Sequence, residues 1–147
     1  MSRCAFILFA AALASVAVPM SAQDGRTPLP SAACASLQGL SIPASAIGLP
    51  TSGAVVQTAV AVAASEQGNT NGDFCKVTGI VKPHNPSSPN LEFEVNLPTA
   101  WNRRVLQMGG GGYNGSLVSG LAGFTLQPAT VENPLKQGFV TVGTDGG

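Results

Sequence analysis

Charged side chains are scarce in this sequence. Only 10% of the 147 residues are Asp, Glu, Lys or Arg, and 7 basic residues balance 7 acidic ones. No run of Lys or Arg is present that could neutralise a row of phosphates, so nothing indicates a nucleic-acid-binding function. The low charge does not indicate disorder, because 44% of the residues are hydrophobic.

Histidine is almost absent. The single His, His84, lies in a proline-rich stretch and is expected to be an exposed loop residue. One His and no Cys-x-x-Cys pair give no zinc-binding pattern. The sequence also lacks the Gly-x-Ser-x-Gly elbow that carries the nucleophile in α/β-hydrolases, and Ser52-Gly53 and Ser119-Gly120 do not complete it. A full Ser-His-Asp triad is therefore not expected within these residues.

Cysteines number only 3, and their positions separate them. Cys4 lies in Met1–Ala22, an apolar stretch with a small residue at its end, which predicts a secretory signal peptide that is too short to span a membrane. Its removal leaves Cys34 and Cys75 in an oxidising compartment, where an even pair favours a disulfide. Two free buried thiols or half of a metal site are the alternatives. The expected location is secreted or periplasmic.

The many glycines and prolines, 18 and 11, predict a protein rich in strands and loops. Residues 23–30 are expected to be a linker and Ser31–Gln38 a short helix that Gly39 ends. Ser41–Gly53 and Lys82–Asn90, which contain prolines, are expected to be loops. The predicted strands are Ala54–Ala64, which could also be a buried helix, Cys75–Val81, Leu91–Leu97, Val105–Met108 and Gly138–Gly143.

The predicted strands differ in their surroundings. Leu91–Leu97 alternates, so that Glu92, Glu94 and Asn96 are expected to face water. Turns rather than helices separate the early strands, which predicts antiparallel pairing. Val105–Met108 is continuously apolar, as in a covered strand, whereas Gly138–Gly143 is expected to lack a neighbour and to expose an apolar edge.

The sequence is organised around Trp101–Ser116, in which a short apolar strand runs into Gly109–Gly112 and then Tyr113-Asn114-Gly115-Ser116. Glycines at a strand end expose backbone N–H groups that can stabilise an oxyanion. A flexible linker is one alternative. The other is a dinucleotide loop, because residues 110–115 fit Gly-x-Gly-x-x-Gly, although the acid expected about 20 residues on could only be Glu132, which does not end a second strand.

Three parts of the sequence carry a resemblance to a known family. They are Leu97-Pro98-x-x-Trp101-Asn102, the glycine run with the Tyr-Asn-Gly-Ser that follows it, and the closing block Gly138–Gly147. Together they resemble the tannase/feruloyl esterase family of secreted serine esterases. The resemblance implies the N-terminal portion of an α/β-hydrolase: an α/β fold, strand-rich with antiparallel leading strands and an incomplete sheet. It implies a signal peptide at 1–22, a linker at 23–30 and part of the catalytic domain at 31–147, truncated before the nucleophile.

The same resemblance assigns residues to roles. The amide of Gly112 would stabilise the oxyanion, Gly111 would face the substrate, and Cys34 and Cys75 sit where the family carries an N-terminal cysteine pair. Asp145 would lie near the site without being the triad acid. The whole enzyme would hydrolyse small-molecule esters of hydroxylated aromatic acids through an acyl-enzyme on a triad beyond residue 147.

The implied requirements are few. The reaction needs no cofactor in this segment, while family members bind calcium in a lid domain that is absent here. We expect no nucleic-acid partner, and no association with a membrane once the signal peptide is cleaved. The segment alone is predicted to be inactive. A secreted non-catalytic binding module and a dinucleotide-binding protein are the alternative functions.

Overall fold

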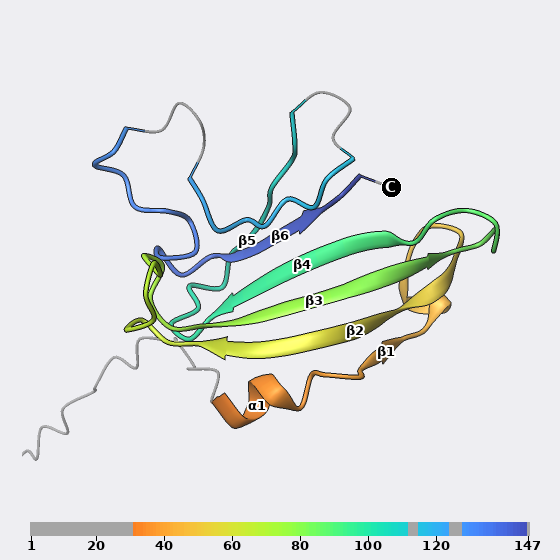
Figure 1. Cartoon of the computed structure of the whole chain (residues 1–147), viewed down its shortest axis with the longest axis horizontal. Helices are drawn as coiled ribbons and strands as arrows, with labels where there is room; N and C mark the ends of the chain where they lie inside the picture. Colours follow the sequence, from red (N-terminus) through yellow and green to blue (C-terminus); the bar gives the residue numbers. More distant parts are fainter. Residues whose placement is uncertain (1–30, 112–114, 124–127, 147) are drawn as a thin grey trace, which may run out of the picture.

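The computed structural model describes residues 31–111, 115–123 and 128–146 (Figure 1). The expected signal peptide, the linker and Gly112 lie outside the described residues. The described chain forms one sheet with the strand order β1-β2-β3-β4-β6-β5. Its elements are α1 (Ser31–Ala35), β1 (Ser41–Ile42), the 3-10 helix η1 (Ala44–Ala46), β2 (Thr51–Val62), β3 (Phe74–Pro83), β4 (Leu91–Pro98), β5 (Val105–Gln107) and β6 (Val140–Thr144).

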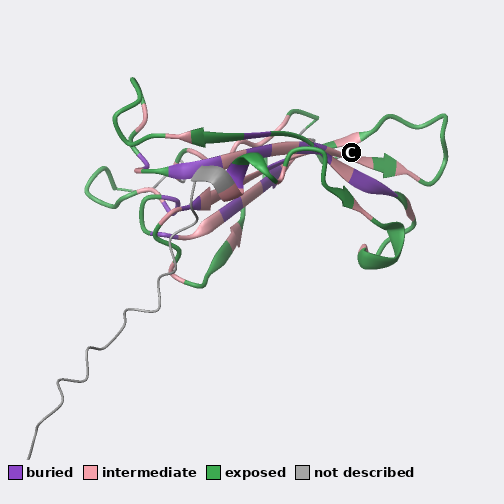
Figure 2. Ribbon diagram, turned by 90° about the horizontal axis from the view of Figure 1, so that it is seen from below, coloured by how far each residue is buried: buried purple, intermediate pink, exposed green. Residues whose placement is uncertain are grey.

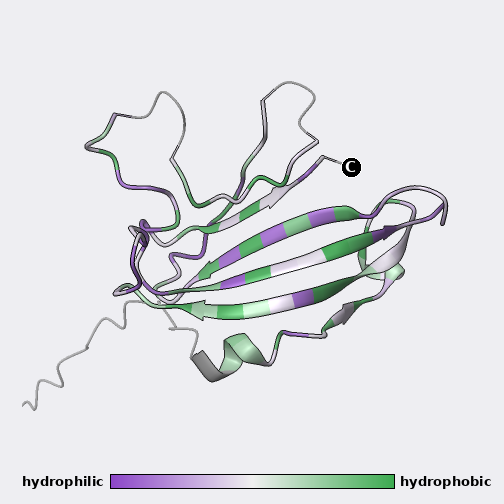
Figure 3. Ribbon diagram, in the orientation of Figure 1, coloured by the Kyte–Doolittle hydropathy of each residue, from purple (hydrophilic) through white to green (hydrophobic). Residues whose placement is uncertain are grey.

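The leading strands are antiparallel, as the turn-rich sequence predicted. Neighbouring strands from β1 to β4, and β4 with β6, pair antiparallel, whereas β5 pairs with β6 in parallel. The result is a mixed, strand-rich sheet with little helix. Figure 3 shows the alternation of hydrophobic and hydrophilic residues along its central strands. That alternation is what made these segments recognisable as strands.

Two of the expected loops contain regular structure. Ser41–Gly53 was expected to be irregular, but it holds β1, η1 and the start of β2. Lys82 and Pro83 were assigned to a loop, yet β3 continues through them, and Pro83 lies opposite Thr51. Pro83 is the last residue of β3, where the missing N–H interrupts no further ladder hydrogen bonds. The ambiguous segment Ala54–Ala64 is a strand over most of its length.

The order of the last two strands differs from the prediction. β6 was expected to lack a neighbour, but it lies between β4 and β5. The edge strand is β5, which was expected to be covered, and its Val105 is 62% exposed. An apolar run predicts that a segment is a strand, but it does not say which strands will flank it, because those partners are distant in the sequence. One edge of the described sheet therefore runs along β5, and the other lies at β1.

The apolar core lies where α1 packs against β2 and β3. A disulfide joins Cys34 to Cys75, 41 residues apart, with a Cα–Cα distance of 5.6 Å. The cluster consists of Cys34, Val56, Ala59, Cys75 and Val77, with Leu37, Phe93, Val95 and Leu97 packed against it. Figure 2 shows that the buried residues concentrate along the central strands. The cysteine pair expected from the sequence therefore attaches the N-terminal helix to the core.

The first helix is shorter than predicted. α1 ends at Ala35, and turns continue the chain to Gly39, which adopts a φ of 81°. Gly39 N then donates to Val56 O at 3.0 Å, and Val56 N donates to Leu40 O at 2.9 Å. The chain thus leaves the helix by bonding directly to β2. Among the described residues, no helix has the length and apolarity that a membrane span requires.

Candidate functional site

The polar turn before β5 joins two distant segments. Asn102 N donates to Gly138 O at 2.9 Å, and Asn102 Nδ2 donates to Gln137 O at 2.9 Å. Within the turn, Asn102 Oδ1 accepts from Arg104 N at 3.0 Å, and Trp101 Nε1 donates to Arg104 O at 3.1 Å. These bonds align the starts of β5 and β6. The Trp-Asn pair of the family motif is therefore a structural clamp, and Asn102 supplies most of its bonds.

The glycine-rich loop follows the carboxyl end of β5, and both its arms are bonded to β6. On the outgoing arm, Met108 N donates to Val142 O at 2.7 Å. On the returning arm, Val118 N donates to Thr144 O at 3.2 Å. The two arms are therefore bonded to β6 at positions only two residues apart, Val142 and Thr144. This loop lies at the carboxyl ends of two adjacent parallel strands, the position at which α/β sheets place ligand sites.

The described part of the glycine run is open to solvent. Gly109, Gly110 and Gly111 are exposed. A Cβ atom added at Gly109 or Gly111 would meet no other atom within 4 Å. Gly111, the expected substrate-facing residue, is thus accessible. Gly112, the expected oxyanion donor, lies outside the described residues, so its role remains a prediction.

The returning arm, residues 117–121, lies closely against β6 (Figure 1). A Cβ atom at Gly143 would overlap the carbonyl oxygen of Val118, and it would lie 2.8 Å from the Val118 carbonyl carbon. At Gly120, where φ is 64°, a Cβ atom would lie 3.0 Å from Thr141 Oγ1. Both glycines are needed for this close approach. Gly143 belongs to the closing block of the family motif, and the contact explains why a glycine suits that position.

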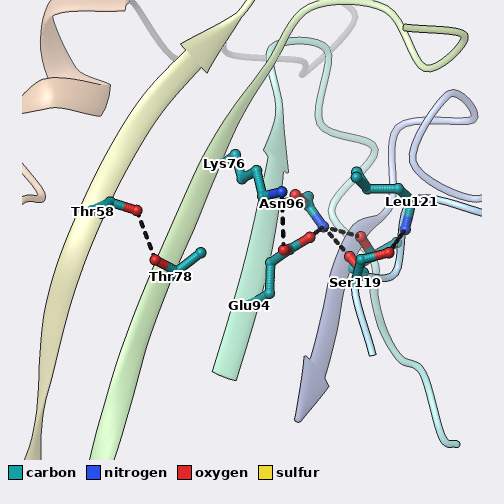
Figure 4. Close-up of polar contacts among 8 residues, drawn as sticks. Thr58, Lys76, Thr78, Glu94, Asn96, Ser119 and Leu121 are labelled. Carbon is teal, nitrogen blue, oxygen red and sulfur yellow. Dashed lines mark hydrogen bonds and ion pairs between the residues drawn. The ribbon is translucent and has the colours of Figure 1, made fainter. Parts of the chain in front are cut away.

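A polar cluster lies beneath the arm, made of the buried Glu94, Asn96 and Thr141, the Ser119 backbone and the partly exposed Lys76 (Figure 4). Glu94 is 2% exposed, whereas Asn96 and Thr141 are fully buried. The prediction that Glu94 and Asn96 face water is therefore wrong, although Glu92 is exposed. The returning arm covers this part of β4, and alternating polarity cannot distinguish a wet face from one covered by polar partners.

Asn96 is the centre of the cluster. Its Nδ2 donates to Ser119 O at 2.7 Å, to Glu94 Oε1 at 3.1 Å and to Thr141 Oγ1 at 3.2 Å. Lys76 Nζ lies 3.2 Å from Glu94 Oε2. The ion pair compensates the burial of the Glu94 carboxylate, which would otherwise be costly. Strands β3, β4 and β6 are thus linked to the returning arm by one chain of polar contacts.

A pocket of about 470 Å³ adjoins this cluster and shares Lys76 and Ser119 with it, towards the end of the sheet that lies away from the glycine loop. It is lined at the β2–β3 turn by Asn69 and Asn71, and by Lys76, Leu121 and Asn133. Its amides bond mainly to protein: Asn133 Nδ2 donates to Asn71 Oδ1 at 3.1 Å, and Asn71 Nδ2 donates to Leu121 O at 3.1 Å. These bonds fasten the far end of the returning arm. The cavity adjoins the start of β3, whereas the glycine loop follows the end of β5.

The remaining sequence candidates take no clear catalytic position in the described chain. His84 is exposed just beyond β3, as expected. Asp145 follows β6, is half-buried, and its N–H donates to Glu92 O at 3.2 Å. Glu132 does not end a strand and pairs with Lys136 at 2.9 Å, so the dinucleotide reading gains no support. No group of three or more His, Cys, Asp and Glu side chains that could hold a metal occurs among the described residues.

Comparison with known proteins agrees with the motifs. Residues 75–147 match the family model described as tannase and feruloyl esterase. This match confirms the resemblance that the motifs indicated. The chain is 47% identical over 114 residues to an uncharacterized esterase of Agrobacterium fabrum, which covers 78% of this chain and 21% of that protein.

Two further relatives are more distant. An uncharacterized esterase of Xanthomonas campestris pv. campestris is 33% identical over 118 residues, covering 80% of this chain and 18% of its own. The mono(2-hydroxyethyl) terephthalate hydrolase of Piscinibacter sakaiensis is 32% identical over 90 residues, which cover 61% of this chain and 14% of that protein. The chain thus spans about a fifth or less of the length of these relatives.

Proposed function

We propose that this chain is the N-terminal portion of a carboxylic ester hydrolase that acts on esters of hydroxylated aromatic acids. The observation that carries the proposal is the glycine loop, held at the carboxyl ends of β5 and β6 inside the segment that matches the tannase and feruloyl esterase family. The names of all three relatives as esterases or hydrolases support the reaction class. The loop supplies no nucleophile, so its contribution is electrostatic.

In the proposed mechanism, a serine beyond residue 147 attacks the ester carbonyl while a histidine removes its proton, and an acid orients that histidine. The carbonyl oxygen becomes negatively charged in the tetrahedral intermediate. The amide of Gly112 donates to that oxygen, and the amide following the serine provides the second donor. Gly111 faces the substrate. Residues 1–147 alone, without the serine and histidine, are expected to be inactive.

The sheet geometry suits this completion as an α/β-hydrolase. β5 is one of the two edge strands of the described sheet and already runs parallel to β6. A further strand parallel to β5 would end at the same edge as the glycine loop, because parallel strands align their carboxyl ends. A serine elbow at its end would then lie beside Gly109–Gly111. The exposed edge of β5 would gain the neighbour that such an edge requires.

The disulfide supports export to an oxidising compartment, as does the signal sequence expected at 1–22. The proposed reaction requires no cofactor from this segment, and any calcium site is expected in a lid domain. The proposed partner is therefore a small-molecule aromatic ester, met in the periplasm or outside the cell.

The test uses the longer protein that carries this chain together with its serine. Methyl gallate and methyl ferulate should be hydrolysed, and a fluorophosphonate should label a single serine and abolish that activity. Titration with NAD should produce no binding signal. A folded longer protein that hydrolyses no aromatic or aliphatic ester would refute the proposed function, and saturable NAD binding would support the dinucleotide alternative.

A further inference from the structure

The interior position of Asn96 requires an explanation. Asn96 lies near the end of β4, two residues before Pro98, and its side chain is fully buried. A buried amide is costly unless it is hydrogen-bonded, so an apolar residue would be the simpler choice at this position. Asn96 Oδ1 has no hydrogen-bond partner among the described residues. The chain therefore tolerates a buried polar group whose bonding capacity is only partly used.

The hydrogen bonds of the amide nitrogen explain why a buried amide is tolerated at this position. Three oxygen atoms face Nδ2, from Glu94, Ser119 and Thr141, and the backbone oxygen of Ser119 is nearest at 2.7 Å. An amide carries two N–H donors, so these acceptors compete, and the shortest contact takes the best share. The flipped amide would point its oxygen at a carboxylate and a carbonyl. The orientation with an unpaired oxygen is therefore the better of the two.

Glu94 and Lys76 fix the orientation of the donor. Glu94 Oε1 accepts from Asn96 Nδ2, while Glu94 Oε2 is held by Lys76 Nζ at 3.2 Å. Figure 4 shows this sequence of contacts running across β3 and β4 towards Ser119. The donor thus points at Ser119 O because a buried charge, itself anchored on β3, holds it there.

The bonded carbonyl has a particular place in the chain. Ser119 follows Val118, whose N–H is bonded to Thr144 O and ends the excursion of the glycine loop. The outgoing arm is fixed through Met108. The bond from Asn96 to Ser119 is a side-chain bond that holds the returning arm to the sheet. Glycines at positions 120 and 143 allow the arm to come close enough for it.

We infer that Asn96 is a positioning residue, which fixes the returning arm of the glycine loop and through it the direction of the loop amides. In its catalytic consequence this inference rests on the proposed function. Asn96 touches no reacting atom and acts through the returning arm, residues 117–121. Its loss lets the arm leave the sheet, and the oxyanion donors then spend less time in the productive geometry.

The first test is hydrogen exchange on the whole chain, and it does not depend on enzymatic activity. Asn96→Leu keeps a similar side-chain size but removes both donors, and Asn96→Ala removes the whole amide. The matched control is Thr78→Val, which removes the 2.7 Å contact between the Thr58 and Thr78 hydroxyls on the same sheet face. Exchange in peptides covering 115–121 should rise at least about tenfold in both Asn96 variants, with β2 and β3 unchanged.

Unchanged exchange in this arm would overturn the inference, and so would an equal rise in the Thr78→Val control. If Asn96→Leu does not fold, Asn96→Ser gives the same information, because its hydroxyl is too short to reach Ser119 O. Faster exchange throughout the sheet, without an excess in 115–121, would assign Asn96 a general structural role and would also overturn the inference.

The second test uses the longer active protein. Asn96→Ala should lower kcat by about 10-fold to 100-fold and change KM by less than about threefold, since misaimed donors affect the transition state more than substrate binding. Inhibition by phenylboronic acid should weaken in parallel. Equal losses in kcat with Thr78→Val would overturn the assignment. A wild-type protein without esterase activity would refute the proposed function, while hydrogen exchange would still decide the positioning role.

Discussion

Gly143→Ala is the perturbation for which the structure gives the most definite consequence. The added methyl group would overlap Val118 O and lie 2.8 Å from the Val118 carbonyl carbon and 3.0 Å from its Cβ. The obstructing atoms belong mainly to the backbone, so no side-chain rotation relieves the overlap. Either the returning arm or β6 must move, and β6 is bonded on both sides by β4 and β5. The arm is therefore expected to be displaced.

The cost can be estimated from the bonds that would break. Inserting a methyl group into a packed contact typically costs about 1–3 kcal/mol. Moving the arm also weakens the bonds from Val118 N to Thr144 O and from Asn96 Nδ2 to Ser119 O, each worth about 0.5–1.5 kcal/mol. The combined loss of unfolding free energy should be about 2–5 kcal/mol, because part of the overlap is relieved as the bonds break.

Gly109→Ala is the matched control. It makes the same chemical change at the start of the glycine loop, where an added Cβ meets nothing within 4 Å. Chemical denaturation of both variants should show a loss only for Gly143→Ala, and hydrogen exchange should locate it in residues 115–121. Equal stability of Gly143→Ala and wild type would refute the packing argument, and so would a comparable loss in the control.

Two further predictions concern the sheet and its disulfide. Replacing Cys34 and Cys75 by Ser should lower stability by about 4 kcal/mol in the chain-entropy model for a 41-residue separation, and reducing agent should then have no further effect; equal denaturation midpoints for oxidised and reduced wild type would contradict this. Gly79→Ala should cost about 1–3 kcal/mol, since its Cβ would overlap Val55 O and the Phe93 ring. A thermal melt of Gly79→Ala that matches wild type would show that the ring is not packed there.

The strands could be predicted because their signals are local. β4 alternates over its whole length, and β-branched residues with flanking turns identify β2 and β3. The order of β5 and β6 could not be predicted, because β6 enters the sheet between β4 and β5 through pairings between residues far apart in the sequence. Its place depends on the Asn102 clamp, whose partners Gln137 and Gly138 are equally distant in the sequence.

The candidate site was predictable in its location but not in its support. Four consecutive glycines after an apolar run mark a strand end with exposed amides, and the structure places Gly109–Gly111 there. Asn96 was assigned to a solvent-facing position because a polar residue in an alternating strand usually is. Its bond to Ser119 joins residues that are 23 apart in the sequence, and no local sequence pattern predicts such a bond. Such a polar cluster can be recognised only from the three-dimensional structure, which shows the segment that covers it.

The most direct test of the account is the effect of Gly112→Ala on catalysis in the longer protein, with Gly109→Ala beside it. An oxyanion donor that is misaimed should lower kcat for methyl gallate or methyl ferulate by about 10²–10³-fold, with a smaller change in KM. Gly109→Ala should retain kcat within about threefold of wild type, because the structure leaves room for its methyl group. A folded Gly112→Ala enzyme with the kcat of wild type would contradict the account and place the oxyanion donors outside this loop.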